Sequence, residues 1–115
     1  PSQDSPATVN TTVASANEGS ILPSEYALFQ NYPNPFNPST QIAFDVPTSE
    51  FVMLRVYNLL GQDVQTLINK SMTPGRYTVE WNGSDMLNND VASGVYFYEL
   101  RGESFISRKK MLLIR

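Results

Sequence analysis

The chain contains neither cysteine nor histidine. Without cysteine there can be no disulfide bond and no thiolate metal site, and without histidine the commonest general base and the commonest metal ligand are missing. A serine nucleophile would then need a lysine as its base. Strand alternation places Ser107 and Lys109 on one face, but such a pair is typical of a solvated strand face. We therefore expect no catalytic residue, no enzymatic activity and no cofactor.

Paired carboxylates could still act as a general acid and a general base. The carboxylates that lie on or beside expected strands are Asp45, Glu50, Glu80 and Glu99. They belong to different strands, and nothing in the sequence brings two of them together. We expect them to be surface or rim charges.

Long hydrophobic runs are also missing. No apolar segment approaches the roughly 18 residues of a membrane span, so we expect no membrane insertion. The chain starts at Pro1 and shows no signal peptide, and we interpret it as a piece of a longer protein.

Basic residues are unevenly distributed. The net charge is −3 and no lysine or arginine precedes Arg55, whereas four of the eight basic residues occupy the last eight positions: Arg108, Lys109, Lys110 and Arg115. A nucleic-acid-binding domain would carry a broad basic patch, so we expect no nucleic-acid partner.

The composition divides the chain into two parts. Residues 1–21 are rich in Ser, Thr, Asn and Ala and contain no aromatic residue, which is typical of a flexible linker. Residues 22–115 are long enough for one folded domain with its own core.

The apolar residues of this domain recur with a period of two, which predicts β-strands. Half-buried strands are expected around residues 42–46, 52–57 and 76–81, a central strand at 95–100 and a last strand at 104–114. The segment 63–68 is weaker, because its alternation slips between Thr66 and Leu67, as a β-bulge would cause. With turn residues between the strands and no helical period, the pattern predicts an all-β antiparallel sandwich of six or seven strands.

The segment NYPNPFNPST (31–40) can join neither a helix nor a central strand, because three prolines lack N–H groups and restrict their neighbours. We expect this stiff segment to close the open end of the sandwich, with Phe36 and Tyr32 packed inside and asparagine side chains bonding free backbone groups. A polyproline ligand for a partner's aromatic groove is the alternative.

Two further features have both a structural and a functional interpretation. In the loop 82–90, Asp85 and Asp90 are weak candidates for calcium ligands, although the loop lacks the EF-hand pattern and Asn/Asp-rich loops are ordinary turns. Trp81 could belong to a sugar-binding aromatic row, but it shares a strand face with Tyr77 and Val79 and is therefore expected in the core. A carbohydrate-binding module and a passive Ig-like spacer are the rival functional interpretations.

The motifs FQNYPNPFNPSTQIAFDVP, VMLRVYNLLGQDVQTL, GRYTVEWNG, ASGVYFYEL and KKMLLIR follow one another along residues 28–115. In this order and spacing the chain resembles the type A C-terminal sorting domains of type IX secretion substrates from Bacteroidetes and related phyla. Similar strands occur in flagellar hook-capping proteins. The residues that carry the structural motif are Asn34, Pro35, Phe36, Asn37, Pro38, Gly61, Gly94 and Tyr96.

This resemblance implies an Ig-like sandwich of about seven strands that is a secretion and sorting signal. It implies an upstream cargo domain in the same chain, recognition by the type IX translocon of the outer membrane, and cleavage by a sortase-like surface protease within the linker. The cargo would be secreted or held at the cell surface, and we expect a monomer. Because half of the cationic residues gather at the end of the chain and the resemblance includes this terminal motif, Lys109, Lys110 and Arg115 are the expected recognition residues. The alternative is that the last strand lies at a sheet edge, where its lysines only discourage unwanted pairing.

Overall fold

The computed structural model of the protein describes residues 22–115, so the expected linker 1–21 lies outside the described residues. Within the described part there are seven strands, and none of it forms a helix that could cross a membrane. The strands are β1 (Ala27–Leu28), β2 (Thr40–Val46), β3 (Glu50–Tyr57), β4 (Asp63–Met72), β5 (Gly75–Trp81), β6 (Gly94–Arg101) and β7 (Ile106–Leu113).

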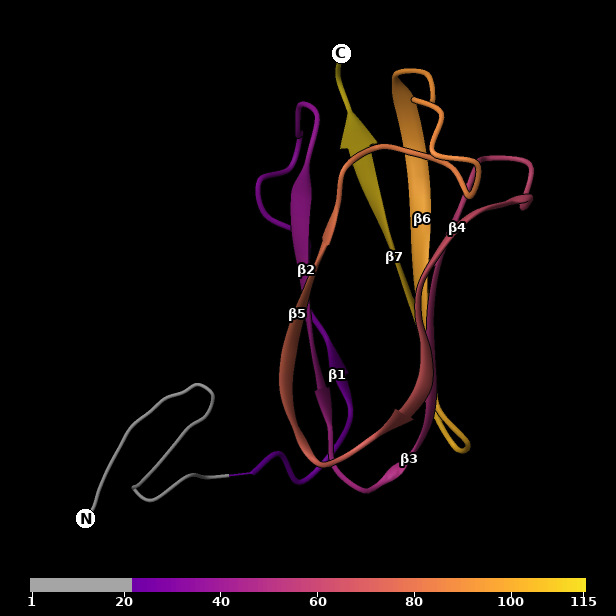
Figure 1. Ribbon diagram of the computed structural model, residues 1–115. Coiled ribbons are helices and arrows are strands. Elements are labelled where there is room, and N and C mark those ends of the chain that lie inside the picture. Colours follow the sequence, from indigo (N-terminus) through magenta and orange to yellow (C-terminus); the bar gives the residue numbers. More distant parts are fainter. Residues whose placement is uncertain (1–21) are drawn as a thin grey trace.

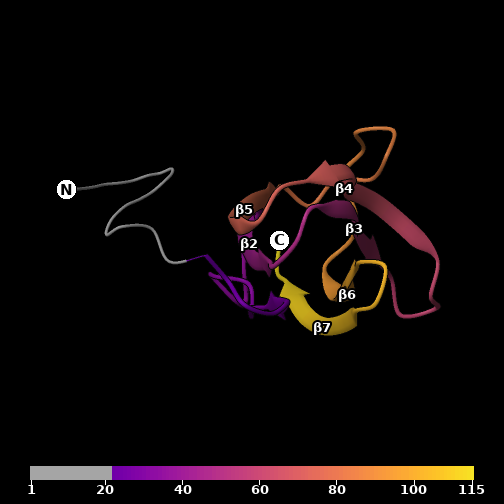
Figure 2. The same ribbon diagram turned by 90° about the horizontal axis from the view of Figure 1, so that it is seen from below.

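The strands form two antiparallel sheets that face each other (Figure 1). One sheet has the order β1-β2-β5 and the other has the order β4-β3-β6-β7. The view along the strands shows β7 beside β1, where the two sheets approach at one side of the sandwich (Figure 2). The predicted all-β Ig-like sandwich is confirmed.

The core forms between the sheets from the alternating apolar residues, as the period of two predicts. Val52, Leu54 and Val56 of β3 are fully buried. The central position of the segment 95–100 is also confirmed, since β6 lies between β3 and β7. The largest fully buried side chain is that of Trp81, whose indole nitrogen donates to the carbonyl of Ser84 at 2.8 Å.

The weak alternation at residues 63–68 has the cause that was predicted. Along the β3–β4 pair the register moves from Leu54 opposite Ile68 to Arg55 opposite Thr66, so Leu67 is left without a partner. A second shift at Val56 and Tyr57 adds another irregularity, and β4 continues to Met72 beyond the expected end. The strand β1 has no signal in the sequence, because its two residues cannot display an alternating pattern.

Residues 31–38, which we call the Pro-rich clip, lie beside the end of β7, where Phe36 forms a parallel β-bridge with Leu113. The backbone N–H of Phe36 donates to the carbonyl of Leu112 at 3.0 Å, and the N–H of Ile114 donates to the carbonyl of Phe36 at 2.9 Å. The ring of Phe36 is 2% exposed and packs 5.7 Å from the Trp81 ring. The prediction that Phe36 closes the core is confirmed.

The prediction for Tyr32 is wrong, because its side chain is 81% exposed. Its backbone exchanges two hydrogen bonds with Gln41, of 3.0 and 2.9 Å, and this bridge leaves the ring outside the sandwich. The buried position next to it belongs to Asn31, whose amide nitrogen donates to Pro33 O and Thr40 Oγ1.

Candidate functional site

The terminal strand β7 forms the edge of the four-stranded sheet, and the Pro-rich clip covers part of that edge. The side chain of Asn34 accepts a hydrogen bond from Leu112 N at 3.0 Å, and Gln30 donates to the carbonyl of Lys110 at 2.9 Å. The side chain of Asn34 thus bonds a free backbone group of the edge, as expected for an asparagine of this segment, and Gln30 bonds a second one. Such cover also protects an edge strand from pairing with other chains.

The expected recognition residues Lys109 and Lys110 point to opposite faces of β7, because neighbouring side chains of a strand alternate. Lys109 shares the inner face with the buried residues Met111 and Leu113 and is half-buried. Lys110 lies on the outer face of the sheet and is exposed.

The third expected recognition residue, Arg115, turns back onto the segment before β6. Its Nε donates to Val91 O and its guanidinium NH2 group donates to Gly83 O, each at 2.6 Å. Its backbone N–H donates to Ser93 Oγ at 2.8 Å, and Asp90 Oδ1 lies 3.7 Å from the guanidinium. Its side chain is only 27% exposed, so the structure does not bring the three terminal cations together into one patch.

The two weak calcium candidates have different partners. The Asp85 carboxylate accepts hydrogen bonds from Leu87 N and Asn89 N, at 3.0 and 2.9 Å, and so closes its own loop. The Asp90 side chain is 80% exposed and faces Arg115. Residues 22–115 contain no group of three acidic residues placed to hold a metal ion.

The remaining motif residues surround the same end of the sandwich. The ring of Tyr96 is buried edge-on against Trp81, and its hydroxyl donates to Ala92 O at 2.6 Å. Gly94 begins β6, and Gly61 lies in the turn between β3 and β4 with a φ of 80°. The other motif residues, Asn34, Pro35, Asn37 and Pro38, are exposed around the buried Phe36.

Two carboxylates that were expected at the surface are buried, and for them that prediction is wrong. Glu99 is 5% exposed on the outer side of β6, where Arg108 lies 3.1 Å and Arg101 3.6 Å from its carboxylate oxygens. Asp45 is 7% exposed and pairs with Arg76. The sequence contains the partners, but only the strand register places them side by side.

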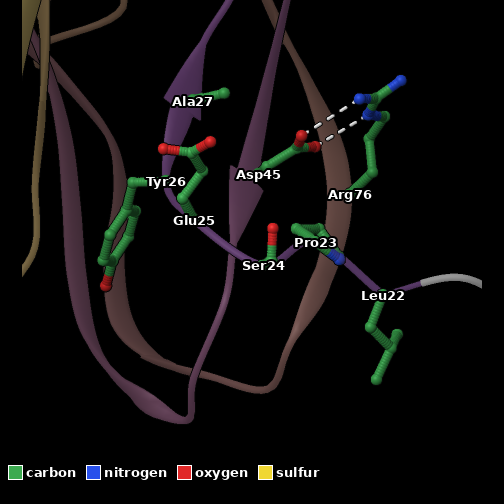
Figure 3. Close-up of a pocket in the computed structure, with 8 residues that line it drawn as sticks. All are labelled: Leu22, Pro23, Ser24, Glu25, Tyr26, Ala27, Asp45 and Arg76. Atoms are coloured by element: carbon green, nitrogen blue, oxygen red, sulfur yellow. Dashed lines mark hydrogen bonds and ion pairs between the residues drawn. The ribbon is translucent and has the colours of Figure 1, made fainter.

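A cleft of about 660 Å³ lies beside this second pair and is lined by residues 22–27, Asp45 and Arg76. Figure 3 shows these residues and the two bonds between Asp45 and Arg76. The Arg76 guanidinium donates two hydrogen bonds to the Asp45 carboxylate, at 2.7 and 3.0 Å. It also lies 4.8 Å from the centre of the Phe29 ring. The charges of Asp45 and Arg76 are therefore already paired with each other, and Glu25 is the third charged residue that lines the cleft.

The burial of Trp81 separates the competing interpretations of the aromatic residues. Its ring is 1% exposed and contacts Phe36 and Tyr96, so it cannot stack on a sugar in this conformation. The carbohydrate-binding interpretation depended on an exposed Trp81, so the structure does not support it.

Comparison with family models identifies the family of the chain. The family model described as secretion system C-terminal sorting domain matches residues 30–114. No curated protein sequence matches the chain.

Among solved structures, PorU from Porphyromonas gingivalis, in its dimeric latent form, superposes with a TM-score of 0.64 at 16% identity over 84% of this chain. PorZ of the same organism, a surface component of its type IX secretion system, gives 0.55 at 20% identity over 76%. The present chain spans only 10% of PorU and 11% of PorZ.

The hook-capping protein FlgD from Xanthomonas campestris has a similar fold, with a TM-score of 0.52 at 18% identity over 79% of this chain and 63% of FlgD. At such low identities these three likenesses establish the fold alone. The family rests on the sequence model, which covers most of the chain and confirms the type IX sorting domain that the motifs resembled. The chain therefore belongs to the family of secretion system C-terminal sorting domains and is a secretion signal.

Proposed function

We propose that this sorting domain directs an upstream cargo domain of the same chain through the type IX secretion system to the cell surface or the medium. The family match over residues 30–114 is the observation that carries this proposal. The partners are the type IX translocon and a sortase-like surface protease, which cuts within residues 1–21. The domain acts as a monomer.

The domain itself is not the catalyst in this proposal. Its sequence has no histidine and no cysteine, and the buried carboxylates Asp45 and Glu99 are each paired with arginine. Its contribution is a stable folded surface that protein machinery can recognise.

Within this proposal, Lys109, Lys110 and Arg115 contribute to recognition in different ways. Lys110 is exposed and can meet a partner directly, whereas Lys109 is half-buried beside the core. Arg115 acts by holding the segment before β6 in place, since its side chain binds two backbone carbonyls there.

The proposal is tested with a reporter protein fused ahead of residues 1–115 in a host that has a type IX system. We expect the fusion to reach the medium or the cell surface and the reporter without the domain to stay inside the cell. Failure of the folded wild-type fusion to leave the cell would refute the proposed function.

The recognition residues are tested in the same assay with the double variant Lys109→Gln and Lys110→Gln. This change removes charge but keeps the first two methylenes of each stem. Lys110 is exposed and Lys109 only half-buried, and the loss of such solvent-accessible charges costs roughly 0–1 kcal/mol of stability. We expect the variant to melt like the wild type and to be exported less. Export at the wild-type level would exclude these two lysines as recognition residues and would leave the sorting function intact.

A further inference from the structure

The outer side of the four-stranded sheet is open to solvent, because the second sheet packs on its inner side only (Figure 2). Alternation places the residues between the buried ones on this outer side. They are Met53, Arg55 and Tyr57 from β3, Phe97, Glu99 and Arg101 from β6, and Arg108, Lys110 and Leu112 from β7. Cations and half-buried apolar side chains thus share one surface.

The strand register groups the cations around a single carboxylate. Arg55 of β3 and Arg108 of β7 lie directly opposite Glu99 on its two sides. In the next row Tyr57 and Lys110 flank Phe97 in the same way. We call the surface formed by Arg55, Arg101, Arg108 and Lys110 around Tyr57 and Phe97 the basic face.

Glu99 holds the arginines of the basic face in place. Its Oε2 accepts a hydrogen bond from the Arg108 guanidinium at 3.1 Å, and its Oε1 accepts one from the Tyr57 hydroxyl at 3.2 Å and lies 3.6 Å from Arg101. Arg55 donates to the Tyr57 hydroxyl at 3.4 Å. A guanidinium carries five N–H donors, so most donors of Arg101 and Arg108, whose side chains are 51% and 58% exposed, have no acceptor within this cluster.

A hollow of about 220 Å³ opens beside these groups. Tyr57, Phe97 and Glu99 line it together with Arg101 and Arg108, and the turn after β3 contributes Leu59. Leu59 is 66% exposed and Leu60 beside it 83%. Apolar side chains and free guanidinium donors therefore border the same depression.

The basic face has the opposite charge to the rest of the chain. Its four cations share the outer side of the sheet with the carboxylates of Glu99 and Asp63, and Glu103 lies at the edge of this side next to Arg101, whereas the whole chain carries a net charge of −3. Guanidinium groups match carboxylates in a planar two-point geometry, and arginine and aromatic residues are enriched in protein–protein interfaces.

We propose that the basic face is the surface by which the domain docks onto an acidic protein surface, one that presents carboxylates flanked by apolar side chains. This inference rests on the proposed function, in which that partner belongs to the secretion machinery. The carboxylates bind Arg101, Arg108 and Lys110, and the apolar side chains enter the hollow beside Leu59.

The test compares two variants that lose the same charge. The face variant carries Arg101→Gln and Arg108→Gln, and the control carries Lys70→Gln and Arg76→Gln, two cations outside the basic face, of which Arg76 also pairs with a buried carboxylate, that of Asp45. Each is fused behind the reporter in the type IX host. We expect the face variant to lower the exported reporter about tenfold and the control to leave it nearly unchanged.

Removing both arginines leaves the Glu99 carboxylate without a cation, so a third variant adds Glu99→Gln. It keeps a hydrogen-bonding amide at this position and removes the charge that would be left without a partner. Melting temperatures of the purified domains identify any variant that has lost its fold. We expect the third variant to be folded and still poorly exported.

A competition assay adds a second measurement. An excess of the wild-type sorting domain without cargo should lower export of the wild-type fusion, because both compete for the same partner. The folded third variant, added in the same excess, should leave that export unchanged. Wild-type export or wild-type competition by the folded third variant would overturn the inference, as would an equal loss in the control. In each of these cases the wild-type fusion is exported, so the proposed function stands independently.

Discussion

At the scale of single residues, the Pro-rich clip shows how two aromatic side chains of one short segment reach different environments. Phe36 pairs through both its N–H and its C=O with the end of β7, which aims its ring at Trp81 between the sheets. Tyr32 pairs with Gln41 instead, and its ring stays in solvent. The hydrogen-bonding partner of the backbone, rather than the aromatic character of the side chain, determines which ring is buried.

The substitution Phe36→Ala should therefore destabilise the domain, and Tyr32→Ala in the same segment is its matched control. Loss of a fully buried phenylalanine costs about 3–5 kcal/mol, because the lost transfer energy and the remaining cavity add. The exposed Tyr32 should change the free energy of unfolding by less than about 0.5 kcal/mol. Urea unfolding of both variants checks this, and equal midpoints would contradict the packing role of Phe36.

The buried hydroxyl of Tyr98 makes the stability of the domain depend on pH in the alkaline range. Burial raises the pKa of its hydroxyl from 10.0 to about 12, while the hydrogen bond from Asn31 N lowers it by less. The unfolded chain releases this proton near pH 10 and the folded chain only near pH 12, so the unfolded state binds fewer protons between these values. Stability is then fully present below pH 10 and falls as the pH rises towards 12.

Replacement by phenylalanine, Tyr98→Phe, separates this effect from packing. The variant loses the hydrogen bonds of the hydroxyl to Phe29 O and Asn31 N, so it should be less stable at neutral pH. Its stability should decline less steeply than that of the wild type across the alkaline window. Parallel curves of urea midpoint against pH would show that Tyr98 does not contribute to the decline.

At the scale of elements, the end of β7 is connected to the segment before β6 through the side chain of Arg115. Gly83 accepts one of its hydrogen bonds, adopts a φ of 73° and leaves no room for a side chain. A Cβ at this position would lie 2.6 Å from the Arg115 guanidinium and 3.1 Å from Pro38 O. The clip, the loop before β6 and the terminal strand therefore meet at one point.

The substitution Gly83→Ala tests this junction, and Gly61→Ala serves as its control. Gly61 also has a positive φ of 80°, but a Cβ there would meet no atom within 4 Å. Its replacement should cost only the backbone strain, about 1–2 kcal/mol. Gly83→Ala should cost about 1.5–3 kcal/mol more, because it also displaces a charged hydrogen bond. Equal losses in thermal unfolding would show that Arg115 does not stabilise the junction.

At the scale of the whole molecule, the core residues within the described part of the chain, residues 22–115, all lie between Leu28 and Leu113. A chain that begins at Leu22 should therefore melt at the same temperature as the full chain. A chain that begins at Asn31 should melt lower, because it lacks the buried Leu28 and the Tyr26 ring that stacks 4.8 Å from Phe105. Calorimetry of the three chains checks this, and a lower melting temperature for the Leu22 chain would place the domain boundary nearer the N-terminus.

The alternation of apolar residues was sufficient to predict six of the seven strands and even the bulge at Leu67, since both depend on neighbours in the sequence. It could not predict β1, which exists only because Ala27 and Leu28 pair with β2. The positions of the basic side chains in the fold could not be predicted from the sequence either. The basic residues at the end of the chain are neighbours in the sequence. In the structure, however, the side chains of Lys109 and Lys110 point to opposite faces of β7, and Arg115 binds the loop before β6.

The sequence by itself determined the all-β class, the absence of cysteine and histidine chemistry, and the motifs of a secretion sorting domain, because composition, period and motif spacing are properties of the linear chain. Only the tertiary structure decided that Glu99 is a buried anchor and that Arg101, Arg108 and Lys110 share a face. Strand register joins residues that are far apart in the sequence, such as Arg55 and Glu99, and it arises from packing the two sheets around one core.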